Sequence, residues 1–349
     1  MKMESALPFI AMVIQQIAQV GLMVASQVVN NAGLTTFTFL FYSSFFSTLI
    51  LIPFSYFLHR SALPPLWPAF VHGFFLLGVL GFLMQVLVFV GLLYSSTLLS
   101  SAILQLIPGF TFIIAVLLRM EAFEYKSLST VAKTIGTLVS ILGALVATLY
   151  QGADVLNSTL TSLPPFLNQS STWIIGGFLV MIGALISSLF IISQAFVLRK
   201  YPEELIIMLF YSCGITVLCV FLSLIIQRDS SSWIIDSQLA ILALIYSAVF
   251  GNVFQTCISS WCVKKRGPLF VAMFHPLGIV IAMIASLFTG ETIHVGSLVG
   301  STIIVLGFYL VIWGKAKEWK KKENNFESNN NKKMPLLQDK TDDPEVINL

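Results

Sequence analysis

The chain has 349 residues, of which 57% are hydrophobic and only 10% are charged, and its mean hydropathy is +0.90. Soluble domains carry about 25% charged residues, so this composition excludes an ordinary soluble globular protein and indicates an integral membrane protein. The formal net charge of +3 is too small to indicate a nucleic-acid-binding protein. We therefore expect the lipid bilayer as a partner, and no nucleic acid.

The apolar runs predict an all-α polytopic membrane protein with ten transmembrane helices, because a helix needs about 20 apolar residues to cross the hydrocarbon core. The first run is too long for the apolar part of a signal peptide, so we expect it to remain as the first span. The stretch 69–118 has no Asp, Glu, Lys or Arg, and one helix of that length would measure ~75 Å, so it must turn back at 94–97. The predicted spans are 8–29, 35–57, 70–93, 98–118, 130–150, 173–197, 205–226, 238–257, 268–288 and 295–314.

Positive charges gather in alternate loops, and this asymmetry predicts the orientation. If residues 1–7 form a cytosolic N-terminus, the five opposite loops contain only one basic residue, Arg228. Lys133 lies just inside the fifth span, within snorkelling reach of the cytosolic side. The pattern requires an even number of spans with both termini in the cytosol. The cytosolic loops would hold Arg60, Arg119, Lys126, Arg199, Lys200, Lys264, Lys265 and Arg266.

Two N-x-S/T sequons, at Asn157 and Asn168, agree with this orientation. Both lie in the loop 151–172, which is predicted to be non-cytosolic, the side on which sequons are used. After the last span, residues 315–349 are rich in Lys, Glu, Asn and Asp, which predicts a disordered cytosolic tail. The four cysteines lack zinc-ligand spacing and are interpreted as packing residues.

The chain repeats itself at offsets of 164 to 170 residues, and internal repeats indicate the architecture. We predict one five-helix repeat at 8–150 and a second at 173–314. Because five is odd, the two halves would cross the membrane in opposite senses, as in secondary transporters with inverted repeats. The matched positions are LFYS at 40–43 and 209–212, Gly81 and Gly251, Gln85 and Gln255, Pro108 and Pro276, Glu121 and Glu291, Gly136 and Gly300, and Gly143 and Gly307.

Pro108 and Pro276 stand in the middle of apolar spans, where a proline removes a helical hydrogen bond. Freed backbone groups are tolerated at membrane depth when they are buried in protein or line a wet cavity. The two matched prolines therefore predict broken helices on two walls of one cavity. The alternative is that each proline only kinks its helix for packing.

Uncharged polar residues are the candidate ligands, because the central parts of the spans contain no Asp, Glu, Lys or Arg. Amides both donate and accept hydrogen bonds, so they could bind a zwitterion or a weak acid. The alternative is that they join helices by single hydrogen bonds. His275 is either a substrate or proton ligand or a histidine bonded to a carbonyl. The predicted amide ligands are Gln15, Gln19, Gln27, Gln85, Gln105, Gln194, Asn252 and Gln255.

Glycines spaced seven apart in the fifth and tenth spans predict close helix packing. These are Gly136 and Gly143, and Gly300 and Gly307. Glu121 and Glu291 stand at the ends of spans, as gating residues or as ordinary interface residues. The sequence has no H-E-x-x-H or G-x-S-x-G motif and no pair of intramembrane aspartates. We therefore expect neither an enzyme nor a cofactor or metal.

Several stretches together resemble the plant branch of the drug/metabolite transporter superfamily with EamA-type repeats. This branch comprises the nodulin-21-like or walls-are-thin-related transporters, also called the "usually multiple acids move in and out" family. The resemblance covers about residues 7–320. The similar stretches are PFIAMVIQQ (8–16), LLRME (117–121), AKTIGTLVSILGALVATLY (132–150), GPLFVAMFHPLG (267–278) and GSLVGSTIIVLGFYLVIWGKAKE (296–318).

The resemblance implies ten helices, cytosolic termini and transport of small organic solutes at the plasma membrane or the vacuolar membrane. Amino acids are the best supported substrates of the family, with auxin for some members. This chain departs from the family at Ser43, at Gln105 and at Ser26-Gln27. Two hypotheses for the function stay open: a passive or proton-linked transporter, and a non-transporting receptor or scaffold of the same fold. A homodimer is one candidate assembly of the chain.

Overall fold

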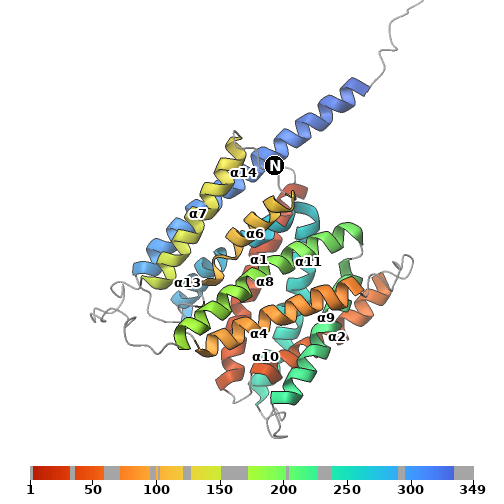
Figure 1. The fold of residues 1–349 in the computed structure, drawn as a ribbon, viewed down its shortest axis with the longest axis vertical. Coiled ribbons are helices and arrows are strands. Elements are labelled where there is room, and N and C mark those ends of the chain that lie inside the picture. Colours follow the sequence, from red (N-terminus) through yellow and green to blue (C-terminus); the bar gives the residue numbers. More distant parts are fainter. Residues whose placement is uncertain are drawn as a thin grey trace, which may run out of the picture.

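The computed structural model describes residues 3–31, 36–58, 71–94, 100, 103–120, 127–150, 172–201, 204–226, 237–289 and 295–333. Every regular element within these residues is a helix (Figure 1). Seven helices are long and apolar enough to cross a membrane, and 7–22, 107–117 and 268–284 form shorter apolar helices. The chain is therefore a multi-pass membrane protein, while the count of ten spans stays a prediction.

The first half of the chain contains α1 (Met3–Asn31), α2 (Thr36–Leu58), the π-helical segment η1 (Val71–Leu77), α4 (Gly78–Tyr94), α6 (Ile107–Leu117) and α7 (Leu128–Leu149). Pro53 lies inside α2 and Pro8 inside α1. η1 continues directly into α4, so both belong to the predicted third span.

The second half contains α8 (Thr172–Lys200), α9 (Glu204–Ile226), α10 (Gln238–Tyr246), the π-helical η3 (Ser247–Phe254), α11 (Gln255–Arg266), α12 (Pro268–Ala272), α13 (Leu277–Thr289) and α14 (Val295–Lys333). α10, η3 and α11 run on without interruption. The predicted end of this span at 257 is too early, because the helix continues until Gly267, whose φ of 89° ends it.

The packing partners repeat between the two halves of the chain. α8 packs against α4 and α6 of the first half. In the same way, α1 packs against η3, α11 and α13 of the second half. Three further pairs join matched predicted spans: α2 with α9, α6 with α12, and α7 with α14. Figure 1 shows α7 and α14 side by side along one side of the bundle.

Both proline-containing segments are interrupted beside their prolines. A turn at 105–106 precedes α6, in which Pro108 occupies the first helical turn. A longer turn at 273–276 separates α12 from α13 and ends at Pro276. In that turn the N–H groups of Phe274, His275 and Leu277 donate to carbonyls three residues earlier, at 3.0–3.2 Å. The backbone thus tightens where proline removes the ordinary donor.

Glycines bring α7 and α14 into backbone contact. A Cβ atom on Gly136 would lie 2.7 Å from the Gly307 carbonyl oxygen, and one on Gly143 would lie 2.7 Å from the Ile304 nitrogen. Gly300 is buried in the same interface. Lys133 differs from its predicted snorkelling role. It is 1% exposed, and its Nζ lies 2.8 Å from Oε2 of Glu318 on α14.

The largest buried apolar cluster fills the bundle at the end where α1 begins and α8 and α11 finish. Its members include Leu198 and Val263 near the ends of α8 and α11. α12 is buried within this cluster, where the Phe270 ring lies 5.0 Å from the Phe9 ring, edge to face. The Phe274 ring lies 4.8 Å from that of Phe308.

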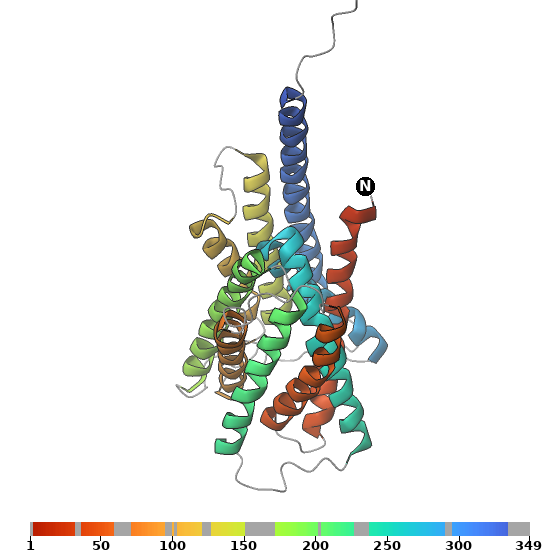
Figure 2. The ribbon, with the colours of Figure 1, turned by 90° about the vertical axis from the view of Figure 1, so that its right-hand side faces the viewer.

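α14 continues as a helix to Lys333. The polar composition of 315–349, in contrast, predicts a disordered tail. Figure 2 shows this extension leaving the bundle at the end where the N-terminus lies. Residues 334–349 lie outside the described residues. The prediction is wrong for 315–333, because a helix already formed in the membrane is extended more readily than a new one is started.

Candidate functional site

The predicted amide ligands other than Gln27 are buried or half-buried, and several have a buried polar atom without a partner among the described residues. These atoms are Oε1 of Gln15, Gln85, Gln105 and Gln194, and Nε2 of Gln255. Buried polar atoms normally have hydrogen-bond partners, and each exception calls for an explanation. The five residues come from α1, α4, the turn before α6, α8 and α11, so both halves of the chain contribute.

Gln194 of α8 also serves as a helix connector. Its Nε2 donates to Oγ of Ser260 on α11 at 2.9 Å, and it lies 3.8 Å from the Met208 sulfur on α9. Gln194 is 1% exposed. The amide nitrogen of Gln194 therefore joins helices, as the alternative interpretation of these amides expects. Its oxygen, Oε1, has no partner among the described atoms.

A cluster of hydroxyl groups joins the middle of α2 to the middle of α9. Thr48 Oγ1 lies 2.8 Å from Ser212 Oγ and 3.1 Å from Thr216 Oγ1, and Ser47 Oγ lies 3.3 Å from Ser212 Oγ. The sequence reasoning missed this cluster. The repeated LFYS stretch, which ends at Ser43 and Ser212, was the available signal.

Asn252 of η3 lines a small pocket of mixed polar and apolar side chains beside this hydroxyl cluster. Ser44, Ser47, Ser212 and Thr256 are among the other lining residues. The centre of a water molecule can occupy about 10 Å³ of this pocket. On the same measure, one buried water needs ~10–15 Å³. In this conformation the pocket accommodates about one water and no organic solute.

Among the described pockets, Asn252 and Gln85 line two different ones. Gln85 lines a separate pocket with Leu40 of α2 and Cys219 and Ser223 of α9. Gln15 and Gln19 lie half-buried on α1, and Gln255 lies half-buried at the start of α11. The structure therefore distributes the amides over the contacts between the two halves of the bundle.

Two buried contacts are formed at the helix interruptions. The Ile107 carbonyl, next to Pro108, accepts hydrogen bonds from Thr111 Oγ1 at 2.8 Å and from Ser188 Oγ of α8 at 3.1 Å. The Thr111 bond is the usual contact of a helical threonine with the carbonyl four residues earlier, and the Ser188 bond joins α8 to the first turn of α6. Pro108 and Pro276 are both buried.

His275 is exposed although the residues on both sides of it, Phe274 and Pro276, are buried. Opposite the same turn, Gln16 of α1 approaches Gly278. A Cβ atom on Gly278 would lie only 3.1 Å from Gln16 Oε1. The imidazole ring of His275 is therefore exposed in the turn between α12 and α13. The first turn of α13, at Gly278, lies close to the amide of Gln16 on α1.

Some predicted residues lie outside what the structure describes. These are Glu121, Glu291, Asn157, Asn168 and the side chain of Gln27. Among the described residues, no group of three or more His, Cys, Asp or Glu side chains could hold a metal ion.

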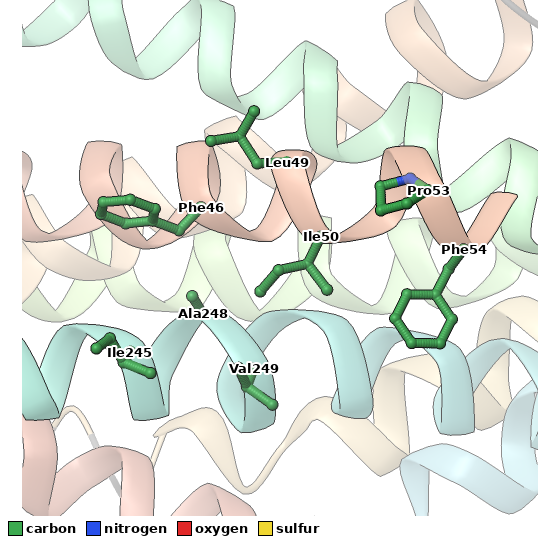
Figure 3. Close-up of a pocket in the computed structure, with 8 residues that line it drawn as sticks. All are labelled: Phe46, Leu49, Ile50, Pro53, Phe54, Ile245, Ala248 and Val249. Atoms are coloured by element: carbon green, nitrogen blue, oxygen red, sulfur yellow. The ribbon is translucent and has the colours of Figure 1, made fainter. Parts of the chain in front are cut away.

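An apolar groove of about 400 Å³ lies between α2 and the segment α10–η3 (Figure 3). Phe46 and Phe54 of α2 lie at its two ends in the view, and Ala248 of η3 contributes a small side chain between Ile245 and Val249. Phe46, Phe54 and Ile245 are 41%, 56% and 54% exposed. An apolar and exposed lining is suited to lipid chains, so we do not assign the groove to a polar substrate.

Comparison with known proteins identifies the family. Three WAT1-related proteins of Arabidopsis thaliana are 38%, 37% and 34% identical to this chain. The matches cover 90%, 90% and 94% of this chain and 88%, 87% and 93% of the relatives. The chain belongs to the WAT1-related family. This family lies in the plant branch of the drug/metabolite transporter superfamily, as the sequence motifs predict.

No protein-family model matches the chain. One solved structure, described only as the crystal structure of a protein, superposes with a TM-score of 0.67 over 89% of this chain and 98% of that one. Its sequence identity is 12%, so it supports the fold alone. Membership of the WAT1-related family makes the chain a membrane transporter of the drug/metabolite type, with a small-molecule substrate.

Proposed function

We propose that this WAT1-related protein is a secondary transporter that exports small organic solutes, with amino acids as its principal substrates. The observation that carries the proposal is the set of buried amide atoms without partners on Gln15, Gln85, Gln105, Gln194 and Gln255. A zwitterion offers both an ammonium donor and a carboxylate acceptor, and amides can bind either.

The architecture that we propose is an inverted pair of five-helix EamA-type repeats with ten spans. The repeated packing partners support it, because α4 with α8 in one half corresponds to α1 with η3 and α11 in the other. In transporters of this kind the substrate lies near the bilayer midplane, between the repeats. The hydroxyl cluster between α2 and α9 is at the middle of both helices, where the two repeats would meet.

We further propose that both termini are cytosolic and that the protein resides in the plasma membrane. The basic ends of α8 and α11 support the orientation, because Arg199, Lys200, Lys264, Lys265 and Arg266 all belong to last helical turns. The apolar cluster around α12 lies at this end. The described conformation would then be closed towards the cytosol.

The site is tested by replacing Gln85 and Gln255 with Leu together. These matched residues lie in different halves, and each has one buried amide atom without a described partner. We expect efflux of labelled amino acids from oocytes to fall at least about fivefold, because losing one good hydrogen bond costs about 1 kcal/mol. Surface delivery should be unchanged.

Gln238→Leu is the matched control, since it makes the same chemical change at an exposed position at the start of α10. It should transport like the unmodified protein. Normal efflux in Q85L/Q255L with normal surface delivery would overturn the assignment of these amides. If the unmodified chain shows no flux at all, the receptor or scaffold hypothesis gains support.

A further inference from the structure

α14 is much longer than a membrane crossing requires. It has 39 residues, which corresponds to ~58 Å at 1.5 Å per residue. Its apolar part, Leu298–Glu318, already has the length and hydropathy of a membrane span. The remaining residues, 319–333, continue as a helix beyond the span (Figure 2).

The base of this extension is attached to α7 by two short polar contacts. Lys133 Nζ lies 2.8 Å from Glu318 Oε2, and Ser129 Oγ donates to the Gly314 carbonyl at 2.6 Å. Lys133 and Ser129 are both buried. These contacts fix α14 to α7 at Gly314 and Glu318. The distance of each later residue from Glu318 along the helix axis then follows from the rise per residue.

The extension is strongly basic near its base. Residues 315–333 contain seven lysines and three glutamates, and Glu318 is already paired with Lys133. Lys317 is exposed, and its Nζ lies 5.1 Å from the centre of the Trp313 ring. Lysine beside tryptophan is typical of the interface between lipid headgroups and hydrocarbon.

α11 adds a second basic patch at the same end of the bundle. Lys265 Nζ lies 4.6 Å from the centre of the Trp261 ring, which repeats the pairing seen on α14. The sulfur of Cys262 lies 3.8 Å from the Pro8 carbonyl oxygen, so the end of α11 is beside the start of α1. The N-terminus and the α14 extension lie at one end in both views (Figures 1 and 2).

We propose that these lysines form a binding surface for anionic phospholipids of the leaflet that faces this end. We name it the basic collar, and define it as Lys265 with Lys317, Lys320, Lys321 and Lys322. Charge complementarity selects this partner, since basic residues beside a span attract anionic headgroups within about one Debye length, ~8–10 Å. Lys320–Lys322 stand only ~3–6 Å beyond Glu318 along the helix.

Helix geometry supplies a control within the same extension. Lys332 and Lys333 carry the same charge but stand ~21 Å beyond Glu318, outside the reach of the headgroups. A tail without structure would let all five lysines reach the lipid. A continuous helix predicts that only the three near its base contribute.

The test uses the full-length purified protein, with binding of phosphatidylserine and phosphatidylcholine compared by native mass spectrometry. We expect the unmodified protein to prefer phosphatidylserine. K320Q/K321Q/K322Q should lower this preference about tenfold or more, since each lysine contributes about 1 kcal/mol, or about fivefold. K320R/K321R/K322R should keep the preference, and K332Q/K333Q should change it less than about twofold.

Thermal unfolding of each variant confirms that the fold is intact. The basic collar is overturned if the unmodified protein binds both lipids equally, or if K320Q/K321Q/K322Q keeps the preference. An equal loss of preference in K332Q/K333Q would show that lysines far along the helix also reach the headgroups. It would overturn the claim that the helix limits binding to Lys320–Lys322. Because no transport is measured, these results are independent of the substrate proposed above.

Discussion

Replacing Lys133 with Met tests whether the buried ion pair holds α14 to α7. Lys133 is 1% exposed and Glu318 is 12% exposed, and their charged atoms lie 2.8 Å apart. Met keeps most of the aliphatic stem, so the apolar packing of residue 133 is largely preserved. The change leaves the Glu318 carboxylate beside α7 without this cation.

The expected loss of stability follows from the burial of the pair. Breaking a buried pair by removing one partner costs about 3–5 kcal/mol. Glu318 is 12% exposed to solvent, so we expect a loss at or just below the lower limit of this range, about 2–3 kcal/mol. At ~2–4 °C for each kcal/mol, this loss lowers the Tm by about 4–12 °C.

Thermal unfolding of the purified protein in detergent measures this loss, with Lys264→Met as the control. Lys264 Nζ lies 2.9 Å from Glu204 Oε1, nearly the same distance, but these side chains are 40% and 21% exposed. An exposed pair contributes less than about 1 kcal/mol. Adding Glu318→Gln to Lys133→Met should recover part of the loss, because it removes the carboxylate charge that Lys133 neutralises in the unmodified protein. Equal Tm values for K133M and K264M would refute the reasoning.

Three further predictions concern packing, the hydroxyl cluster and the interrupted helix. Gly143→Val should lower stability by about 1–3 kcal/mol in thermal unfolding, since its Cβ would meet the Ile304 nitrogen at 2.7 Å. Gly109→Ala, which meets only the end of a flexible Ile141 side chain at 3.1 Å, should be tolerated. Ser212→Ala should cost about 1 kcal/mol, and a loss below ~0.3 kcal/mol would show that the cluster is not structural. Pro108→Ala should continue the helix through the turn and slow efflux at normal surface level, and an unchanged rate would favour the packing role.

The sequence predicted the membrane class, the positions of most apolar helices and the interruptions near Pro108 and Pro276. These succeed because they depend on local chemistry: apolar length, and the donor that proline lacks. The bounds of α2 and α9 lie within one residue of the predicted spans.

The features that sequence reasoning missed depend on partners far along the chain. Lys133 is predicted to snorkel, but Glu318 is 185 residues away in sequence and neutralises it in place. The repeated LFYS stretch marks only Ser212 of the hydroxyl cluster, and Thr48 and Thr216, which contact each other, lie 168 residues apart in sequence. The distribution of the amides over separate contacts likewise depends on how the helices pack, which no single span encodes.

Efflux of labelled amino acids from oocytes that express the unmodified protein tests the central claim most directly. Indole-3-acetate serves as the comparison substrate, surface delivery is measured in parallel, and a pH step reports any coupling through His275. Our account predicts amino-acid efflux clearly above that of control oocytes. Confirmed surface delivery without flux of any tested amino acid would contradict it.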